Sequence, residues 1–127
     1  MKEKFVFQVL LKTSVKVLET KIATPAGLGE WFCDDVNERE GYYYFTWDSF
    51  DEKAVLLAHK PFQFIRFKWY EDEENGFDTY FEIATELDPL TSNVVLSITD
   101  FSEPEDMENS RMMWDQQIIK LRRLIGS

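Results

Sequence analysis

The last quarter of the sequence constrains the fold most, because it carries a long amphipathic pattern behind a chain that is patterned mostly as strands. Residues 103–125 repeat apolar side chains at spacings of seven, four, three and four, and these residues are Met107, Trp114, Ile118, Leu121 and Ile125. Such spacings place the five side chains on one face of a helix. Strands followed by one long helix are typical of an α+β fold in which the helix packs on the sheet. We therefore predict a helix across the concave face of a curved antiparallel sheet.

Both ends of this segment carry signals for a helix. Ser102 and Glu105 have the spacing of a capping box, in which each side chain accepts a backbone N–H at the helix start. Gly126 follows basic residues in the last turns, as is common where a helix ends. Arg111 is the one polar residue on the apolar face. We expect it either to pair with a carboxylate at the mouth of a cavity or to reach solvent along its stem.

The sequence before this helix predicts six or seven strands and two short helices. Residues 5–11 alternate loosely between apolar and polar side chains and predict the first strand. Thr13 or Ser14, and then Thr24 followed by Pro25, are suited to start the two short helices. The further strands are predicted over residues 36–40, 42–47, 52–59, 62–70, 77–87 and 93–101.

One hairpin can be predicted from the faces of its two strands. A two-residue turn would set Trp69 opposite Glu82, which places an apolar side chain against a charged one. A three-residue loop over residues 74–76 instead sets Trp69 opposite Phe81 and Lys68 opposite Glu82. Because this register keeps apolar residues on one face, we predict the three-residue loop with a bulge.

The composition bounds the class of protein. A chain of 127 residues fits a single domain, residues 1–127, whose core needs neither a disulfide nor a metal. The single cysteine excludes an internal disulfide and favours a cytoplasmic setting. The first residues lack the pattern of a signal peptide and no apolar stretch reaches membrane-spanning length, so we expect no membrane insertion. A net charge of −10 disfavours nucleic acid as a partner.

The segment that contains the second short helix resembles a known family. Residues 24–32, with the sequence TPAGLGEWF, resemble the "TP..L..WF" segment of START-like proteins, and residues 99–101, Trp114 and Leu121 fit the same pattern. These proteins belong to the helix-grip (SRPBCC) superfamily, which includes Hsp90-ATPase-activator-like and Bet v 1-like proteins. The resemblance spans nearly the whole chain, and it is close to the small, bacterial Hsp90-ATPase-activator-like members.

This resemblance implies a fold more than an activity. It implies a curved antiparallel sheet of six to seven strands, two short helices after the first strand, and a long C-terminal helix across the concave face. It also implies a mostly apolar pocket between that helix and the sheet. Members of the superfamily bind lipids, sterols or polyketides, act as cyclases or dehydratases, or assist chaperones, and a shared fold does not choose among these functions.

The chemically reactive residues indicate structural roles, and we expect no catalytic residue. His59 is the only histidine and has no partner motif, so we expect a structural or surface role. Cys33 precedes two aspartates, which raise the pKa of a thiol, and we expect it to be buried. The acidic stretches at 34–40 and 71–78 lack calcium-loop spacing, and no His/Cys pair has zinc spacing. We therefore expect no metal and no cofactor.

The aromatic share of 16% is the one positive signal for a binding site, although aromatic residues also fill cores. Together with the resemblance, it favours a protein that binds a small hydrophobic molecule without transforming it, between the C-terminal helix and the sheet. The residues predicted to bind this ligand are Leu28, Trp31, Phe32, Phe67, Trp69, Phe81, Ile83, Arg111, Trp114, Ile118 and Leu121.

Two alternatives stay open. A cyclase-like or dehydratase-like enzyme would need a titratable residue inside the cavity with a catalytic partner within hydrogen-bond reach. A module that binds a protein partner, by analogy with the chaperone activators, would have a filled core and an exposed apolar or strongly acidic patch.

Overall fold

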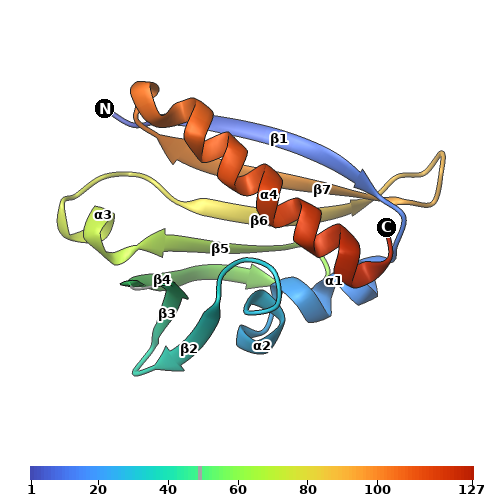
Figure 1. The fold of residues 1–127 in the computed structure, drawn as a ribbon, viewed down its shortest axis with the longest axis horizontal. Helices are drawn as coiled ribbons and strands as arrows, with labels where there is room; N and C mark the ends of the chain where they lie inside the picture. The colour runs from blue at the N-terminus through green and yellow to red at the C-terminus, as the bar shows by residue number, and fades with distance from the viewer. Residues whose placement is uncertain (49) are drawn as a thin grey trace.

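The computed structural model describes residues 1–48 and 50–127, which form an α+β fold. Side chains from the helices and from the sheet share one hydrophobic core. Seven strands build an antiparallel sheet, and a long C-terminal helix crosses its concave face, as predicted (Figure 1). The elements in chain order are β1 (Glu3–Leu11), α1 (Val15–Ile22), α2 (Pro25–Leu28), β2 (Asp35–Arg39), β3 (Tyr42–Trp47), β4 (Phe50–Lys60), β5 (Phe64–Trp69), α3 (Tyr70–Glu74), β6 (Phe81–Leu87), β7 (Val94–Ser102), a 3₁₀ turn η1 (Pro104–Asp106) and α4 (Met107–Ile125).

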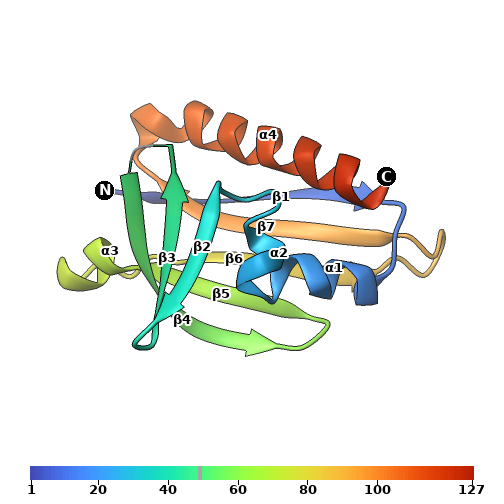
Figure 2. The ribbon, with the colours of Figure 1, turned by 60° about the horizontal axis from the view of Figure 1, so that its bottom comes forward.

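The sheet is ordered β1-β7-β6-β5-β4-β3-β2, so only the link from β1 to its neighbour β7 is long-range. Figure 2 shows that β2, β3 and β4 curl away from the plane of β1 and β7 and form a wall on the side of the sheet where α4 lies. The curvature creates a trough, and α4 runs along it. The two short helices α1 and α2 lie at the end of the trough near the C-terminus of α4.

The starts of the two short helices are confirmed. The Ser14 hydroxyl accepts the Val17 N–H at 3.1 Å, and the Thr24 hydroxyl accepts the Gly27 N–H at 3.0 Å, which satisfies donors that each helix start would otherwise leave unpaired. Leu28, the last residue of α2, is fully buried.

The start of the long helix differs from the prediction. Ser102 does not cap the helix, because it still belongs to β7 and pairs with Glu3 of β1. Its hydroxyl lies 2.8 Å from the Ser110 hydroxyl. The chain passes through η1 before α4 begins at Met107, without a capping side chain. The predicted end is confirmed, since Gly126 adopts a left-handed backbone with φ of 73° and donates its N–H to the Arg122 carbonyl.

The predicted three-residue hairpin loop is wrong. Residues 70–74 form the short helix α3, and the sheet pairs Phe67 with Phe81 and Ile65 with Ile83. The register is therefore shifted by two residues from the predicted one. Because strand side chains alternate with a period of two, a shift of two leaves every side chain on its predicted face but changes its partner. Glu82 consequently pairs with Arg66, whose guanidinium lies 2.6 Å from its carboxylate, rather than with Lys68.

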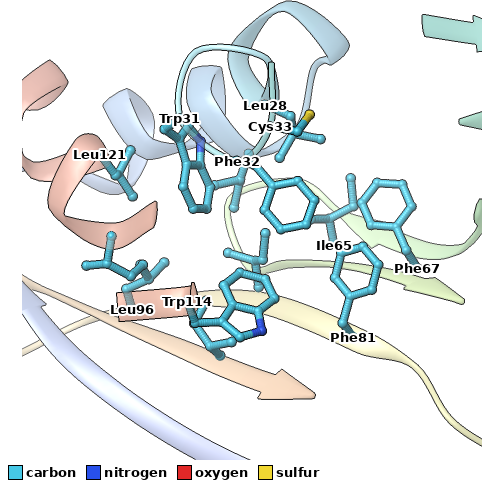
Figure 3. Close-up of a cluster of buried hydrophobic side chains, with 14 of the residues drawn as sticks. Leu28, Trp31, Phe32, Cys33, Ile65, Phe67, Phe81, Leu96, Trp114 and Leu121 are labelled. Atoms are coloured by element: carbon cyan, nitrogen blue, oxygen red, sulfur yellow. The ribbon is translucent and has the colours of Figure 1, made fainter. Parts of the chain in front are cut away.

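The core is dominated by aromatic rings around Phe32, which lies in the chain between α2 and β2 (Figure 3). Its ring stacks on Phe81 of β6 with a centroid distance of 5.6 Å, meets Phe45 of β3 edge-on, and lies 5.2 Å from the Trp114 ring of α4. Aromatic pairs at these distances contribute about 0.5–1.5 kcal/mol each beyond their buried area. Phe32 thus joins the two short helices, the sheet and α4 into one core.

Gly27 is required for the contact between α1 and α2. A Cβ atom at Gly27 would lie 2.1 Å from the Thr20 carbonyl oxygen and 2.8 Å from the Lys21 Cα, both of them backbone atoms of the neighbouring helix. At Gly29, two residues further on, the closest atom would be 3.4 Å away, which is ordinary contact.

We therefore predict that Gly27→Ala destabilises the fold by about 2–3 kcal/mol, as overpacking against backbone typically does. Gly29→Ala is the matched control and should change the free energy of unfolding by less than about 0.5 kcal/mol, because its φ of −66° suits alanine. Urea unfolding of the three proteins, followed by circular dichroism, measures the difference. Equal stability of the two variants would contradict the contact.

Candidate functional site

A pocket of about 270 Å³ lies at the end of the trough where α4 begins, and we call it the α4 pocket. It is bounded by the start of α4, the end of β3, the start of β4 and the ends of β5 and β7. Its aromatic and apolar lining residues are Trp47, Phe50, Trp69, Tyr80, Phe101 and Met113. Its polar lining residues are Lys2, Glu52, Asp72, Thr79, Asp100 and Ser110.

A smaller cavity of about 100 Å³ adjoins this pocket along α4. The two share Trp69, Asp100, Ser110 and Met113, while Phe32, Trp114 and Gln117 line only the smaller one. The inner wall is held in place by hydrogen bonds to the Phe32 carbonyl oxygen, which accepts from the Gln117 amide at 2.6 Å and from the Trp47 indole at 3.2 Å. These contacts close the pocket toward the core.

Asp72 of α3 anchors one side of the pocket floor. The residue is 5% exposed, and both of its carboxylate oxygens accept from the Lys2 ammonium, at 2.9 and 3.0 Å. The Thr79 hydroxyl donates to the same carboxylate. A buried carboxylate is tolerated only when such partners replace its water. This cluster therefore ties the start of the chain to α3 and to the segment that leads into β6.

Asp100 of β7 lies where the two cavities meet. The Trp114 indole donates to Oδ2 at 2.8 Å, and the Phe101 N–H donates to Oδ1 at 2.7 Å. Burial raises the pKa of this carboxyl to about 6, although both hydrogen bonds and the Lys2 ammonium act in the opposite direction. Burial is also the main cause of the raised pKa of Glu52, with the charge of Glu71 adding to it.

The structure places most of the predicted ligand-binding residues in the core rather than around the pocket. Nine of the eleven are buried, and their side chains pack against one another: Leu28, Trp31, Phe32, Phe67, Phe81, Ile83, Trp114, Ile118 and Leu121 (Figure 3). Trp69 is half-buried and lines both cavities, whereas Phe32 and Trp114 line only the smaller one. The pocket therefore lies closer to the start of α4 than the sequence predicted.

Arg111 reaches solvent, which is the second of the two alternatives predicted for it. The residue is exposed, and its guanidinium carbon lies 5.5 Å from the ring centroid of Phe5 and 5.8 Å from that of Phe7. The guanidinium thus lies over two aromatic side chains of β1, and it pairs with no carboxylate of residues 1–48 or 50–127. It does not line the α4 pocket.

Sequence reasoning missed Asp100, although a signal for it exists. Val94, Leu96 and Ile98 are fully buried at alternate positions of β7, and Asp100 continues the same period. Since alternate residues share a face, a carboxylate at the fourth position must point toward the helix side of the sheet. An acidic residue in such a register marks either a polar pocket or a hydrogen bond to a neighbouring element, and here it marks both.

The other reactive residues have structural roles away from the pocket. His59 Nε2 lies 3.0 Å from a Glu19 carboxylate oxygen, and the other oxygen accepts the Phe62 N–H, so this contact ties α1 to the turn between β4 and β5. Cys33 is buried and donates to the Asp35 carbonyl, and burial is the main cause of its raised pKa of about 11.

Within the described ranges, no three acidic, histidine or cysteine side chains are placed to hold a metal ion. No described helix is both long enough and apolar enough to cross a bilayer.

Comparison with known proteins assigns the fold. The family model described as START-like superfamily domain matches residues 1–127. A solution structure of BfR322 from Bacteroides fragilis is 36% identical, covers 97% of this chain and 90% of its own, and has a TM-score of 0.65. The Aha1 dimer from Colwellia psychrerythraea is 13% identical, with coverage of 97% and 96% and a TM-score of 0.80. CalU16 from Micromonospora echinospora is 12% identical, with coverage of 98% and 76% and a TM-score of 0.73. No curated protein matches the chain.

The raised pKa of Asp100 predicts how stability depends on pH. The Asp100 carboxyl holds its proton more tightly in the folded protein than in the unfolded chain, where its pKa is near 3.8. Its contribution to the free energy of unfolding is therefore fully present below pH 3.8 and is lost as pH rises through 6. Relative to Asp100→Asn, the wild type should lose about 1 kcal/mol of unfolding free energy between pH 5 and pH 8. Urea unfolding of both proteins at the two pH values measures this. If the difference in unfolding free energy between the two proteins is the same at both pH values, the pKa of Asp100 is not raised in the folded protein.

Proposed function

Because this chain belongs to the START-like superfamily, whose fold serves as a ligand-binding or interaction module, we propose that it binds a small, mostly hydrophobic molecule in the α4 pocket without transforming it. The supporting observation is the lining itself, in which six aromatic or apolar side chains surround a volume of about 270 Å³. Small-molecule sites are mostly apolar and occupy roughly 300–1,000 Å³. The volume therefore favours a ligand of one or two rings over a sterol or a lipid chain.

The packing of the core supports this position. The side chains beneath the middle of α4, Trp114, Ile118 and Leu121, are at most 5% exposed and already pack against the sheet. A ligand there would have to displace them, which would cost several kcal/mol for each residue removed from the core. In the α4 pocket, by contrast, Trp69 is half-buried and Met113 is exposed. A ligand that covers these two side chains gains apolar burial without displacing the core.

The hydrogen bonds in the pocket favour binding over catalysis. Asp100, the titratable side chain that lines both cavities, is held by the Trp114 indole and the Phe101 amide. Neither of these groups exchanges a proton near neutral pH, so neither serves as a general acid or base. His59, which could do so, lies beside Glu19 of α1 and lines neither cavity.

A second candidate function is docking of a protein partner. It is supported by apolar side chains on α4 that face solvent, of which Met112 is 53% and Ile119 is 44% exposed. These two residues lie seven positions apart and so share one helix face. Docking would use this solvent-facing surface, whereas ligand binding uses the α4 pocket, so substitutions at the two places separate the two functions.

Met113 and Met112 offer a matched pair of substitutions. Met113 lines the α4 pocket, whereas its equally exposed neighbour Met112 does not. We predict that Met113→Trp fills the pocket and weakens ligand binding at least tenfold, while Met112→Trp leaves it unchanged. Binding is measured by nuclear magnetic resonance titration of the tryptophan indole N–H signals with a panel of one-ring and two-ring aromatic compounds. Thermal unfolding checks that both variants fold.

Ligand binding is rejected if no compound shifts the indole signals of Trp47 and Trp69, or if both variants lose binding equally. Native mass spectrometry of protein purified from its own host provides an independent measurement, since a bound molecule adds its mass to the intact protein. If a protein partner binds the wild type and Met113→Trp but not Met112→Trp, the protein-docking function is favoured instead.

A further inference from the structure

We infer that the ligand of the α4 pocket carries a protonated amine beside its apolar body. The inference rests on the proposed binding function and adds the charge of the ligand to it. Three properties of the pocket support it: the hydrogen-bonding groups of the lining, the balance of charge and the aromatic walls.

The hydrogen-bond donors of the lining are mostly used by the protein itself. The Lys2 ammonium donates to both oxygens of Asp72, and the Thr79 hydroxyl donates to the same carboxylate. The Ser110 hydroxyl lies 2.8 Å from the Ser102 hydroxyl, which in turn donates to a backbone carbonyl. A ligand that needs donors from the protein therefore finds few that are uncommitted.

Acceptors, in contrast, are in surplus. Each Asp100 oxygen accepts one N–H, from Trp114 or from Phe101, and a carboxylate has about four acceptor sites in total. Glu52 accepts no hydrogen bond from the part of the chain that the structure describes. An alkylammonium group has three donors and no acceptor, so it matches this lining, whereas a carboxylate or phosphate has acceptors only.

The charges lead to the same ligand class. Three carboxylates and one ammonium line the pocket, and that ammonium is already shared by both oxygens of Asp72. Burial raises the pKa of Asp100 to about 6 and also raises the pKa of Glu52, and the Lys2 ammonium, which lowers the pKa of both groups, offsets this only in part. A cationic ligand would add counter-charge, and an anionic ligand would be repelled. The net charge of −10 also steers cations toward the protein.

The aromatic walls suit a cation as well as an apolar body. Trp47 and Trp69 present indole rings, and an ammonium within about 6 Å of such a ring is attracted to its face. The protein already holds one ammonium in this way on the opposite face of β4. Lys53, whose neighbour Glu52 points to the opposite side of β4, places its Nζ 4.1 Å from the Tyr42 ring centroid and 3.9 Å from that of Tyr70.

Three probes of nearly equal size separate charge from shape: 1-naphthylmethylamine, 1-naphthylmethanol and 1-naphthoate. At pH 7 we expect the amine to bind at least tenfold more tightly than the alcohol, and the carboxylate to bind most weakly, in the same indole N–H titration. Glu52→Gln should weaken binding of the amine at least fivefold and leave the alcohol unchanged. Glu86→Gln is the matched control, because it removes the same charge from an exposed position near the far end of β6.

The outcomes distinguish the inference from the function on which it rests. If the alcohol or the carboxylate binds as tightly as the amine, the ligand is not an amine, but the pocket still binds small molecules. If Glu86→Gln weakens the amine as much as Glu52→Gln does, the preference reflects the net charge of the protein and the inference is overturned. If none of the three probes shifts the signals of Trp47 or Trp69, the proposed binding function fails as well.

Discussion

The packing of Phe32 is the constraint on which the rest of the structure depends. Its ring contacts aromatic residues of β3, β6 and α4, and its backbone carbonyl accepts hydrogen bonds from the Trp47 indole and the Gln117 amide. One residue outside any strand or helix thereby fixes the distance between the β2–β4 wall and α4. Because that distance is fixed by packed rings, the trough holds only the smaller cavity of about 100 Å³ beside Phe32, and the larger α4 pocket lies beyond it, toward the start of α4.

This arrangement explains why the pocket is partly polar. The large apolar side chains on the concave side of the sheet pack around Phe32 in the core. The open end is lined instead by residues that join elements together, including the Asp72–Lys2 pair and the Asp100–Trp114 hydrogen bond. The same polar contacts that hold α3 to the start of the chain and β7 to α4 therefore define the chemistry that a bound molecule meets.

Much of the fold could be predicted from the sequence, because its signals are local. The hydroxyl caps at Ser14 and Thr24, the glycine at the end of α4 and the apolar face of that helix each act within a few residues. The β5–β6 register could not be predicted, because an alternating strand keeps its faces under a two-residue shift and the formation of α3 decided between the registers. The predicted cap at Ser102 failed for a related reason, since pairing with Glu3 in the sheet outweighed a local signal.

The candidate site was less predictable than the fold. Nothing in the sequence pattern separates a tryptophan that fills a core, such as Trp31 at 1% exposure, from one that borders an opening, such as Trp69. Only the summed volumes of side chains from four or five distant elements determine where space remains. Asp100 was the exception, since its place in the alternation of β7 could be recognised without coordinates.

The two ends of the molecule differ in how tightly they are held together. The contact between Glu19, His59 and the Phe62 amide belongs to the tighter end. At one end, α1 is joined to the β4–β5 turn and α2 packs against α1 with no room for a methyl group at Gly27. At the other end, the border of the opening is made of side chains such as Phe50 and Met113, which are more than half exposed and contribute little to the core. Substitutions can therefore accumulate around the opening while the framework stays intact, so relatives that share this architecture are free to diverge in what they recognise without having to evolve a new way to fold.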